Sequence, residues 1–375
     1  MKKIIISENA TKMRLDIFLS QNLNASRAQV AECIKSQGVR VNGKICAKPS
    51  ALLKLNDCVE FAQQQALQNT ESSTLTQDKT LVSKKEFSQI EILYKDDDIL
   101  LLNKPPNLII HDAPSTKEPT LLDWLKLTQK PLDSLSGNLR YGIVHRLDRF
   151  TSGALAVARN LKAHTSLSNQ LKTRTMGRIY LAVITPKLKS DMVIECYLGR
   201  NPKNRLKMAK LASIDSQPLQ DSHLLQDSHF AHRLQSAQNP QIPQSTPTLP
   251  KNLRYAKSAF VKLLDSKNGC FELIAIKLFT GRTHQIRAHL ESINRHILGD
   301  ELYGYKQESS RISYNGRILL HAHIMYLQHP STMDTLFFKA PLFADMLNFL
   351  EQNFQKDKLN EVLDNNTLLQ RFSNF

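Results

Sequence analysis

The spacing of apolar residues near the start of the chain predicts a small module of two helices and a hairpin. Large apolar residues recur at helical spacing over 15–23, which predicts a helix with one buried face. A capping box at Ser26 begins a second predicted helix, and Gly38 ends it. Residues 39–45 then predict two strands joined at an Asn-Gly pair, because this pair tolerates the positive φ angles of a tight hairpin turn.

Two polar stretches divide the rest of the chain. From 62 to about 84, Gln, Ser, Thr and Asn dominate, and such a segment buries too little apolar surface to offset its ordering entropy. It therefore predicts a linker. A second stretch, about 211–251, repeats Leu-Gln-Asp-Ser-His and predicts a surface insertion. The apolar runs outside these stretches predict strands at 1–8, 90–94, 99–104, 178–183, 259–264 and 270–276.

These patterns indicate an α+β protein with a small α/β module at its N-terminus. A chain of 375 residues exceeds the usual size of one domain, which is roughly 100 to 200 residues. The predicted boundaries are 1–61 for the module, 62–86 for the linker, 87–350 for the main domain with its insertion, and 351–375 for a C-terminal tail.

The overall composition is that of a soluble globular protein, with 41% hydrophobic and 22% charged residues. No apolar run approaches the roughly 18 residues that would span a membrane. Glu8 and Asn9 interrupt the apolar start before a signal-peptide core forms. We therefore expect a cytoplasmic protein without membrane contact. The 5 cysteines form no Cys-x-x-Cys pair, and their odd number argues against both a disulfide framework and a zinc site.

The charge balance favours a polyanionic partner. Lys and Arg number 50 against 34 Asp and Glu, a net charge of +16, which suits nucleic acid. A basic protein with no such partner remains an alternative. In the N-terminal module, cationic residues fall between the apolar positions and can meet phosphates from one surface, unless they form only a solvated face: Arg14, Arg27, Lys35, Arg40, Lys44, Lys48 and Lys54.

Segment 140–153 places an apolar strand, several charged groups and a Thr-Ser-Gly turn within a few residues of one another. A loop that leaves a strand holds side chains in a cleft while the strand fixes their positions. Asp148 lies between Arg146 and Arg149, and a neighbouring cation favours its ionised form. Considered alone, such an Asp is more often structural, in an ion pair or as a cap, than catalytic.

A second cluster, 280–290, contains His284, Arg287 and His289 after the flexible Gly281. A helix from about residue 283 places His284 and Arg287 on adjacent turns, so that Arg287 points where His284 does not. A metal site is disfavoured, because the two histidines are five positions apart and no Glu lies between them. In the predicted strand at 178–183, Tyr180 considered alone is a core tyrosine.

A set of short motifs occurs along the chain. They are His-Arg-Leu-Asp-x-x-Thr-Ser-Gly at 145–153, Arg-x-Tyr at 178–180, Gly-Arg-Thr-His-Gln-Ile-Arg-x-His at 281–289, Asn103-Lys104-Pro105-x-x-Leu108, Lys207-Met208-Ala209, Leu298-Gly299-Asp300, Leu320-His321-Ala322 and, in the module, Arg14-Leu15-Asp16 with 39–43. Together these motifs resemble the RluA family of pseudouridine synthases over about 90–341, apart from the insertion. The N-terminal module resembles the S-four-type RNA-binding module, and the combination is most similar to the branch that acts on large-subunit ribosomal RNA. The resemblance implies a pseudouridine synthase fold, with a mixed, mainly antiparallel sheet flanked by helices.

The resemblance also implies a reaction and roles for single residues. Such enzymes break the bond between N1 of uracil and C1′ of ribose and join C5 to C1′, with no cofactor or metal. Asp148 would act at C1′, as nucleophile or as base, and Arg287 would hold it ionised. Tyr180 would stack on the extruded base and help to remove the C5 proton, and Arg146 would fill the vacated stack. The expected RNA contacts are His145, Arg282 and His284, with Arg14, Arg27, Arg40 and Lys44 of the module.

Two features depart from the family pattern, and several alternatives stay open. Arg178 stands where a lysine is often seen, and the insertion is longer than the family needs. The same isomerisation on transfer RNA is one alternative, and a non-catalytic RNA-binding ribosome-assembly factor is another. A hydrolase is disfavoured, because no oxyanion-hole glycine run or serine elbow accompanies Asp148. We expect a monomer, and the sequence does not identify the modified uridine.

Overall fold

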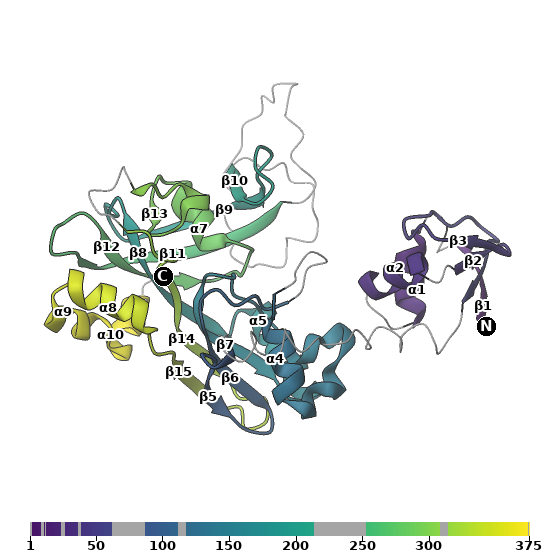
Figure 1. Ribbon diagram of the computed structural model, residues 1–375, viewed down its shortest axis with the longest axis horizontal. Helices are drawn as coiled ribbons and strands as arrows, with labels where there is room; N and C mark the ends of the chain where they lie inside the picture. The colour runs from purple at the N-terminus through teal and green to yellow at the C-terminus, as the bar shows by residue number, and fades with distance from the viewer. Residues whose placement is uncertain are drawn as a thin grey trace, which may run out of the picture. The chain divides into compact units, whose positions relative to one another are not determined.

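The computed structural model describes residues 2–8, 11, 13–23, 27–36, 39–61, 87–111, 118–213, 253–307, 314–373 and 375 (Figure 1). Contacts divide the chain into two compact units. The first comprises Met1–Gln89, His111–Val144 and Val157–His164, and the second comprises Ile90–Ile110, His145–Ala156 and Thr165–Phe375. The predicted linker, 62–86, and positions 214–251 of the predicted insertion lie outside the described residues.

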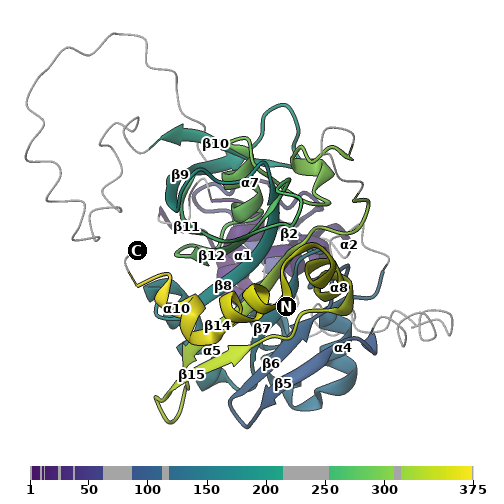
Figure 2. The same cartoon turned by 90° about the vertical axis from the view of Figure 1, so that its left-hand side faces the viewer.

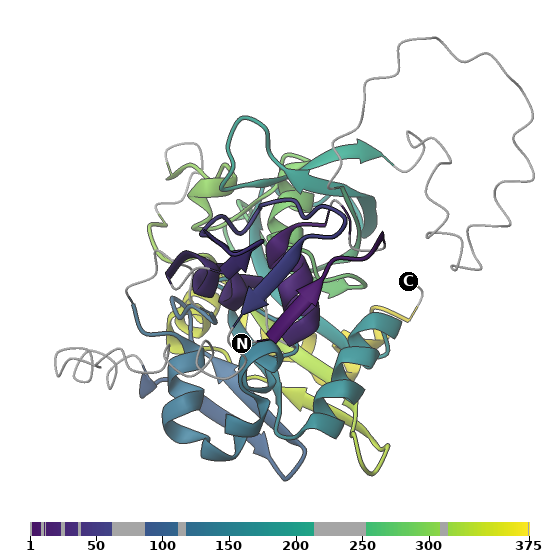
Figure 3. The same cartoon turned by 90° about the vertical axis from the view of Figure 1, so that its right-hand side faces the viewer.

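The N-terminal module contains the two predicted helices and the predicted hairpin, which can be followed in purple in Figures 1 and 3. Apolar residues from both helices and from the sheet share one core, among them Phe18, Ile34 and Val59. The hairpin turn has φ angles of 53° at Asn42 and 75° at Gly43, as its Asn-Gly pair predicts. The sheet order is β1-β4-β2-β3, and the elements are β1 (Lys2–Ile5), α1 (Leu15–Leu23), α2 (Arg27–Ser36), β2 (Val39–Val41), β3 (Lys44–Cys46) and β4 (Cys58–Phe61).

An 11-stranded sheet forms the body of the rest of the chain. Its strand order is β10-β9-β11-β12-β8-β14-β7-β6-β5, with β13 paired to β8 and β15 paired to β14. Antiparallel pairs dominate, and β14 pairs with β7 in parallel. The strands predicted at 90–94, 99–104, 178–183, 259–264 and 270–276 are confirmed. The strands are β5 (Glu91–Lys95), β6 (Ile99–Lys104), β7 (Ser152–Ala158), β8 (Gly177–Thr185), β9 (Met192–Arg200), β10 (Met208–Ser213), β11 (Arg254–Asp265), β12 (Glu272–Leu278), β13 (His296–Ile297), β14 (Leu320–Gln328) and β15 (Thr335–Lys339).

Short helices alternate with these strands along the chain. Local sequence explains their bounds, as at Thr120, whose side chain forms a capping box with Asp123 and begins a helix there. They are α4 (Leu121–Thr128), α5 (Leu161–Thr173), α7 (Gln285–Glu291), α8 (Ala344–Asn353), α9 (Lys356–Val362), α10 (Asn365–Gln370) and the 3-10 helices η2 (Lys130–Leu135), η3 (Gly137–Gly142) and η6 (Glu301–Tyr303). None of the described helices is long and apolar enough to cross a membrane.

Residues 351–375, the predicted C-terminal tail, contribute apolar side chains to a core that they share with the large sheet. Helices α8, α9 and α10 lie together in Figures 1 and 2, and Phe354, Leu359, Leu368 and Phe372 are buried in the same core as residues of β8, β11 and β12. The core therefore extends well beyond residue 350.

Strand β8 separates this core from the site. Its odd-numbered residues Ile179, Leu181 and Val183 belong to the core that contains the C-terminal helices. Side chains alternate between the two faces of a strand, so Arg178 and Tyr180 lie on the opposite face. A packed core therefore lies on the face of β8 opposite Arg178 and Tyr180 and holds the strand in place.

Candidate active site

The backbone before Asp148 differs from the predicted apolar strand. Residues 144–148 have no regular structure, and the preceding η3 is kinked by φ angles of 50° at Arg140, 51° at Tyr141 and 81° at Gly142. Gly142 is required at its position, because a Cβ there would lie 1.9 Å from the carbonyl oxygen of Ala158. The apolar pair that follows is too short to form a strand and makes only an isolated bridge between Ile143 and Val157.

A buried lysine fixes the loop that carries Asp148. The Lys104 ammonium donates to the carbonyl oxygens of Pro105 at 2.7 Å, Leu108 at 3.0 Å and Arg149 at 3.1 Å. Burial lowers the pKa of Lys104 to about 7, and the nearby Asp148 carboxylate opposes this shift. Three carbonyl acceptors match the three donors of an ammonium group, which favours the charged form. Sequence reasoning quoted Lys104 as part of a motif but gave it no role.

Arg287 has a closer partner than the one predicted for it. Its guanidinium donates to Asp300 through two hydrogen bonds, of 2.7 and 2.8 Å, while its Nη1 lies 3.7 Å from Oδ2 of Asp148. Burial lowers the pKa of Arg287, but Asp300 and then Asp148 raise it more, so the net shift is upward. Asp300 is thus the residue that orients Arg287, and the Asp148 contact is the looser one. Sequence reasoning missed this function of Asp300.

His284 also approaches Asp148, contrary to the prediction that it and Arg287 point different ways. Helix α7 begins at Gln285 rather than near 283, and His284 has a left-handed backbone with φ of 51°. This conformation places its Nε2 3.9 Å from Oδ2 of Asp148. Burial lowers the pKa of His284, and Asp148 partly opposes the shift. Two nitrogen groups therefore face the same carboxylate oxygen.

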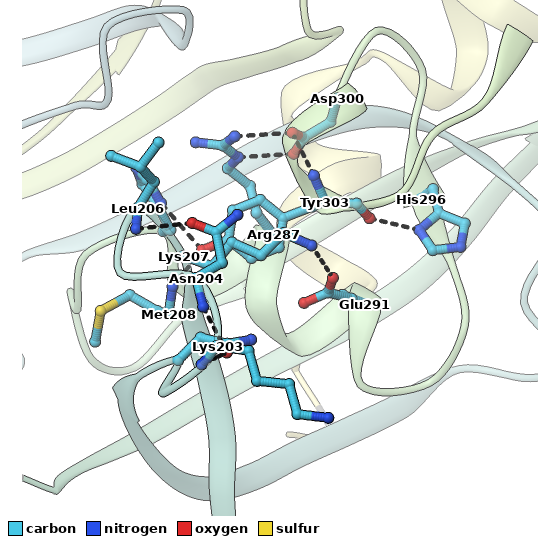
Figure 4. A network of polar contacts seen from close by, with 12 residues as sticks. Lys203, Asn204, Leu206, Lys207, Met208, Arg287, Glu291, His296, Asp300 and Tyr303 are labelled. Carbon is cyan, nitrogen blue, oxygen red and sulfur yellow. Dashed lines mark hydrogen bonds and ion pairs between the residues drawn. The ribbon is translucent and has the colours of Figure 1, made fainter.

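Tyr303 connects these groups to the hairpin of β9 and β10, and Figure 4 shows Tyr303 together with Arg287 and Met208. Its hydroxyl accepts a 2.7 Å hydrogen bond from the Met208 amide and lies 3.0 Å from Nδ1 of His284. The Arg287 guanidinium lies 4.6 Å from the centroid of its ring. Burial raises the pKa of Tyr303 to about 12, so the hydroxyl keeps its proton at neutral pH. The Tyr303 hydroxyl and the His284 imidazole therefore share one hydrogen bond, whose direction depends on the tautomer of the imidazole.

Gln285 fixes the turn that precedes α7, and sequence reasoning missed it. Its carbonyl oxygen accepts from the Thr280 hydroxyl at 2.8 Å and the Arg282 amide at 3.0 Å. Its amide nitrogen donates to the Lys257 carbonyl at 3.0 Å and the Ser258 hydroxyl at 2.8 Å. All four hydrogen-bonding positions of this buried side chain are used. The turn that presents His284 is therefore tied to β11.

The structure brings the three residues that the sequence predicts as catalytic to one hollow, which we call the Asp148 hollow. Tyr180 contributes a ring that is only 4% exposed, and burial raises the pKa of its hydroxyl. Arg146 and Arg282 lie at the same hollow, and Arg146 hydrogen-bonds Thr283. The hollow is lined by Arg146, Leu147, Asp148, Thr151, Arg178, Tyr180, Leu278, Gly281, Arg282, Thr283, His284, Gln285, Ile286, Arg287 and Leu320.

His145 does not have the geometry expected of an RNA contact. Its Nε2 accepts a 3.0 Å hydrogen bond from the amide of Ala156 on β7, and its Nδ1 lies 3.4 Å from Arg178. Burial and the Arg178 charge lower its pKa well below the usual value, so the ring is neutral. The His145 side chain instead anchors the loop to the sheet. Its position next to Arg146 in the sequence does not predict this inward orientation.

The predicted RNA-binding residues of the N-terminal module have different surroundings. Arg14 pairs with the buried Asp16 through bonds of 3.0 and 2.9 Å, which limits its availability. Arg40 is exposed and donates to the Gly43 carbonyl at 3.0 Å, and Lys44 is exposed beside it. The side chain of Arg27 lies outside the described residues. Lys44 and Arg40 are the clearest candidates for phosphate contacts.

A second, larger cleft lies beside Asp148. It has a volume of about 760 Å³ and shares Asp148, His284 and Arg287 with the Asp148 hollow. We call it the Phe150 cleft; its other lining residues are Pro106, Asn107, Arg149, Phe150, Gly299, Asp300, Glu301, Leu302, Gly316, Arg317, Ile318 and Asp345. Among the described residues, no group of three or more His, Cys, Asp or Glu is arranged to hold a metal ion.

Comparison with known proteins identifies the family of this chain. Residues 98–292 match the model of the RNA pseudouridylate synthase family, and residues 13–59 match that of the S4 domain. An uncharacterized RNA pseudouridine synthase of Helicobacter pylori (strain J99) is 42% identical over 376 residues, 99% of each chain. The chain belongs to the RNA pseudouridine synthase family. The predicted family, the predicted class of enzyme and the predicted N-terminal RNA-binding module are confirmed.

Other RNA pseudouridine synthases extend the comparison along the chain. The uncharacterized RNA pseudouridine synthase YlyB of Bacillus subtilis is 31% identical and covers 94% of this chain and 98% of its own. The protein named ribosomal large subunit pseudouridine synthase D of Pseudomonas aeruginosa is 29% identical and covers 86% of each chain. An alignment over 94% of this chain includes both the N-terminal module and the segments that surround Asp148.

Proposed function

We propose that this RNA pseudouridine synthase isomerises uridine in large-subunit ribosomal RNA, with Asp148 as the catalytic carboxylate. The observation that carries the proposal is the placement of Asp148 at a hollow with Tyr180, His284 and Arg287 around it. The choice of ribosomal RNA is supported by the S4 domain and by the name of the Pseudomonas aeruginosa relative.

The chemistry follows from charge. Breaking the bond from N1 to C1′ builds positive character on the ribose, which a carboxylate at C1′ stabilises or attacks. Arg287 faces Oδ2 of Asp148 from 3.7 Å and is itself held by Asp300, so it orients the carboxylate. The base then turns, C5 bonds to C1′, the C5 proton leaves and N1 ends with a proton. The product is an isomer of the substrate.

Tyr180 is better suited to packing against the base than to removing the C5 proton. Burial raises the pKa of its hydroxyl, so the phenol stays protonated near neutral pH and is a poor base. Its ring lines the Asp148 hollow, where stacking on uracil needs only the aromatic face. Arg146 is exposed at the rim, in position to enter the stack from which the uridine is extruded.

Mapping of modified nucleotides tests the substrate. Pseudouridines are mapped in ribosomal and transfer RNA from cells with and without the gene, and then after wild-type protein is restored. We expect at least one uridine of large-subunit ribosomal RNA to lose its modification and to regain it. Loss confined to transfer RNA would contradict the ribosomal assignment, and no loss at any uridine would contradict the proposed activity.

The N-terminal module is expected to contribute phosphate contacts that depend on salt. Lys44→Ala removes one exposed cation, so RNA binding should weaken, and the slope of log affinity against log salt should fall by about 0.7 to 0.9 if one phosphate contact is lost. Lys358→Ala on α9 makes the same charge change at another exposed position and serves as the control. Equal slopes for both variants and the wild type would remove Lys44 from the interface.

A further inference from the structure

Phe150 is a large aromatic side chain held in the open next to the proposed catalytic carboxylate. It is 41% exposed, it lies two residues after Asp148, and both residues line the Phe150 cleft. Scattered exposed apolar residues are ordinary on protein surfaces. An exposed aromatic ring in a cleft that also contains the catalytic group requires a more specific explanation.

The backbone around Phe150 is fixed. The Thr151 amide donates to the Asp148 carbonyl at 3.1 Å, which closes a turn with Phe150 inside it. The Arg149 carbonyl accepts from the buried Lys104, and the Arg149 side chain donates to Asn107 at 3.0 Å. The Arg149 guanidinium also lies 5.4 Å from the centroid of the Phe150 ring. The ring is therefore presented in one place at little entropic cost to a ligand that stacks on it.

The charges of the two cavities indicate what each of them accepts. The Asp148 hollow is lined by four arginines, Arg146, Arg178, Arg282 and Arg287, and by one carboxylate. The Phe150 cleft is lined by three arginines and four carboxylates. Two of those arginines, Arg287 and Arg317, already make bidentate pairs with Asp300 and Asp345. Phosphates therefore favour the first cavity, and an uncharged flat group favours the second.

We propose that the Phe150 cleft is a subsite for the base of a nucleotide next to the target uridine, stacked on Phe150. The inference rests on the proposed function, since it needs an RNA strand with its target at Asp148. Asp148 lines both cavities, so a base in the Phe150 cleft is adjacent to a uridine in the Asp148 hollow. Stacking on an aromatic ring accepts any base, so Phe150 strengthens binding at this position without selecting a sequence.

The test measures RNA binding and turnover separately. A fragment of large-subunit ribosomal RNA that contains the mapped uridine is labelled with 2-aminopurine at the preceding or the following nucleotide. We expect the wild-type protein to change the fluorescence of one of these labels, and Phe150→Ala to abolish the change and to weaken binding about 5- to 100-fold. In steady-state assays KM should rise accordingly, with kcat nearly unchanged.

Two further variants separate stacking from mere apolar contact. Phe150→Trp should restore binding, and Phe150→Leu should not, because leucine lacks an aromatic face. Phe337→Ala removes another exposed aromatic residue, on β15 and outside the Phe150 cleft, and should behave as the wild type. Melting temperatures within a few degrees of one another show that all the variants fold.

The outcomes distinguish this inference from the proposed function. If the wild-type protein is active and Phe150→Ala binds the RNA fragment equally tightly, the subsite proposal is wrong and the catalytic proposal stands. Binding that depends on Phe150 in a protein without turnover would support the subsite and overturn the catalytic proposal. An unlabelled fragment with an abasic site at the responding position should bind the wild type as weakly as the intact fragment binds Phe150→Ala. Full affinity for that abasic fragment would also refute base stacking.

Discussion

Asp148→Asn should reduce single-turnover pseudouridine formation by about 10³-fold or more. An amide of the same shape supplies no negative charge at C1′ and is neither a nucleophile nor a base. The fold should tolerate the change, because the Asp148 side chain is 22% exposed and the nearest nitrogen atoms of Arg287 and His284 lie 3.7 and 3.9 Å away. The measurement is the rate with saturating enzyme, accompanied by a melting curve.

Asp191→Asn is the matched control for this experiment. Asp191 is an exposed carboxylate that pairs with Arg371 at 3.0 Å, and it lines neither cavity beside Asp148. Its replacement by Asn should leave the rate within about twofold of the wild type, since an exposed pair contributes about 0 to 1 kcal/mol to stability. Asp148 is not the catalytic carboxylate if Asp148→Asn converts uridine at a rate similar to that of this control.

Asp300→Ala should destabilise the protein by about 3–5 kcal/mol. The change leaves the Arg287 guanidinium, which is 5% exposed, without the carboxylate that accepts two of its hydrogen bonds. An uncompensated buried charge is costly, and Arg287 would also lose the partner that directs it toward Asp148. Denaturant unfolding measures the free energy, and turnover below the melting transition measures the loss of orientation.

Asp345→Ala offers a comparison with the same geometry in a more exposed setting. Asp345 also accepts two hydrogen bonds from one arginine, Arg317, but its side chain is 46% exposed. We expect that variant to lose only about 0–1 kcal/mol. If the free energy of unfolding of Asp300→Ala equals or exceeds that of Asp345→Ala, burial of the Arg287–Asp300 pair does not contribute the stability that we propose.

Elements that depend on neighbouring residues could be predicted from the sequence. The helix at Leu15–Leu23 follows from four apolar residues at helical spacing, and the first hairpin follows from the Asn42-Gly43 turn. Strands such as β6 and β12 contain continuous apolar runs. The placement of Asp148, Tyr180 and Arg287 at one hollow was predicted from three motifs in combination, although no one motif was decisive alone.

Features that depend on contacts between distant residues could not be predicted in this way. The sequence does not show that Arg287 bonds more tightly to Asp300 than to Asp148, since this depends on where η6 lies against α7. It does not show that Lys104 is buried, because three carbonyl groups from two loops satisfy its charge. The sequence also does not predict the left-handed backbone of His284. This conformation depends on Gln285, whose side chain ties the turn to β11.

Strand β9 pairs with β10 on one side and with β11 on the other. Because of this pairing, the number of residues between β10 and β11 can change without displacing the residues of the active site. Strand β10 ends with Ser213 opposite Cys196, and β11 begins with Arg254 opposite Leu198, on the other side of the same strand. The two ends are held by sheet pairing, whatever number of residues lies between them. The free energy of closing a loop grows only with the logarithm of its length, by about 0.6 kcal/mol for each doubling. Evolution can therefore add sequence at this position at small thermodynamic cost, while the Met208 amide that contacts Tyr303 stays where it is.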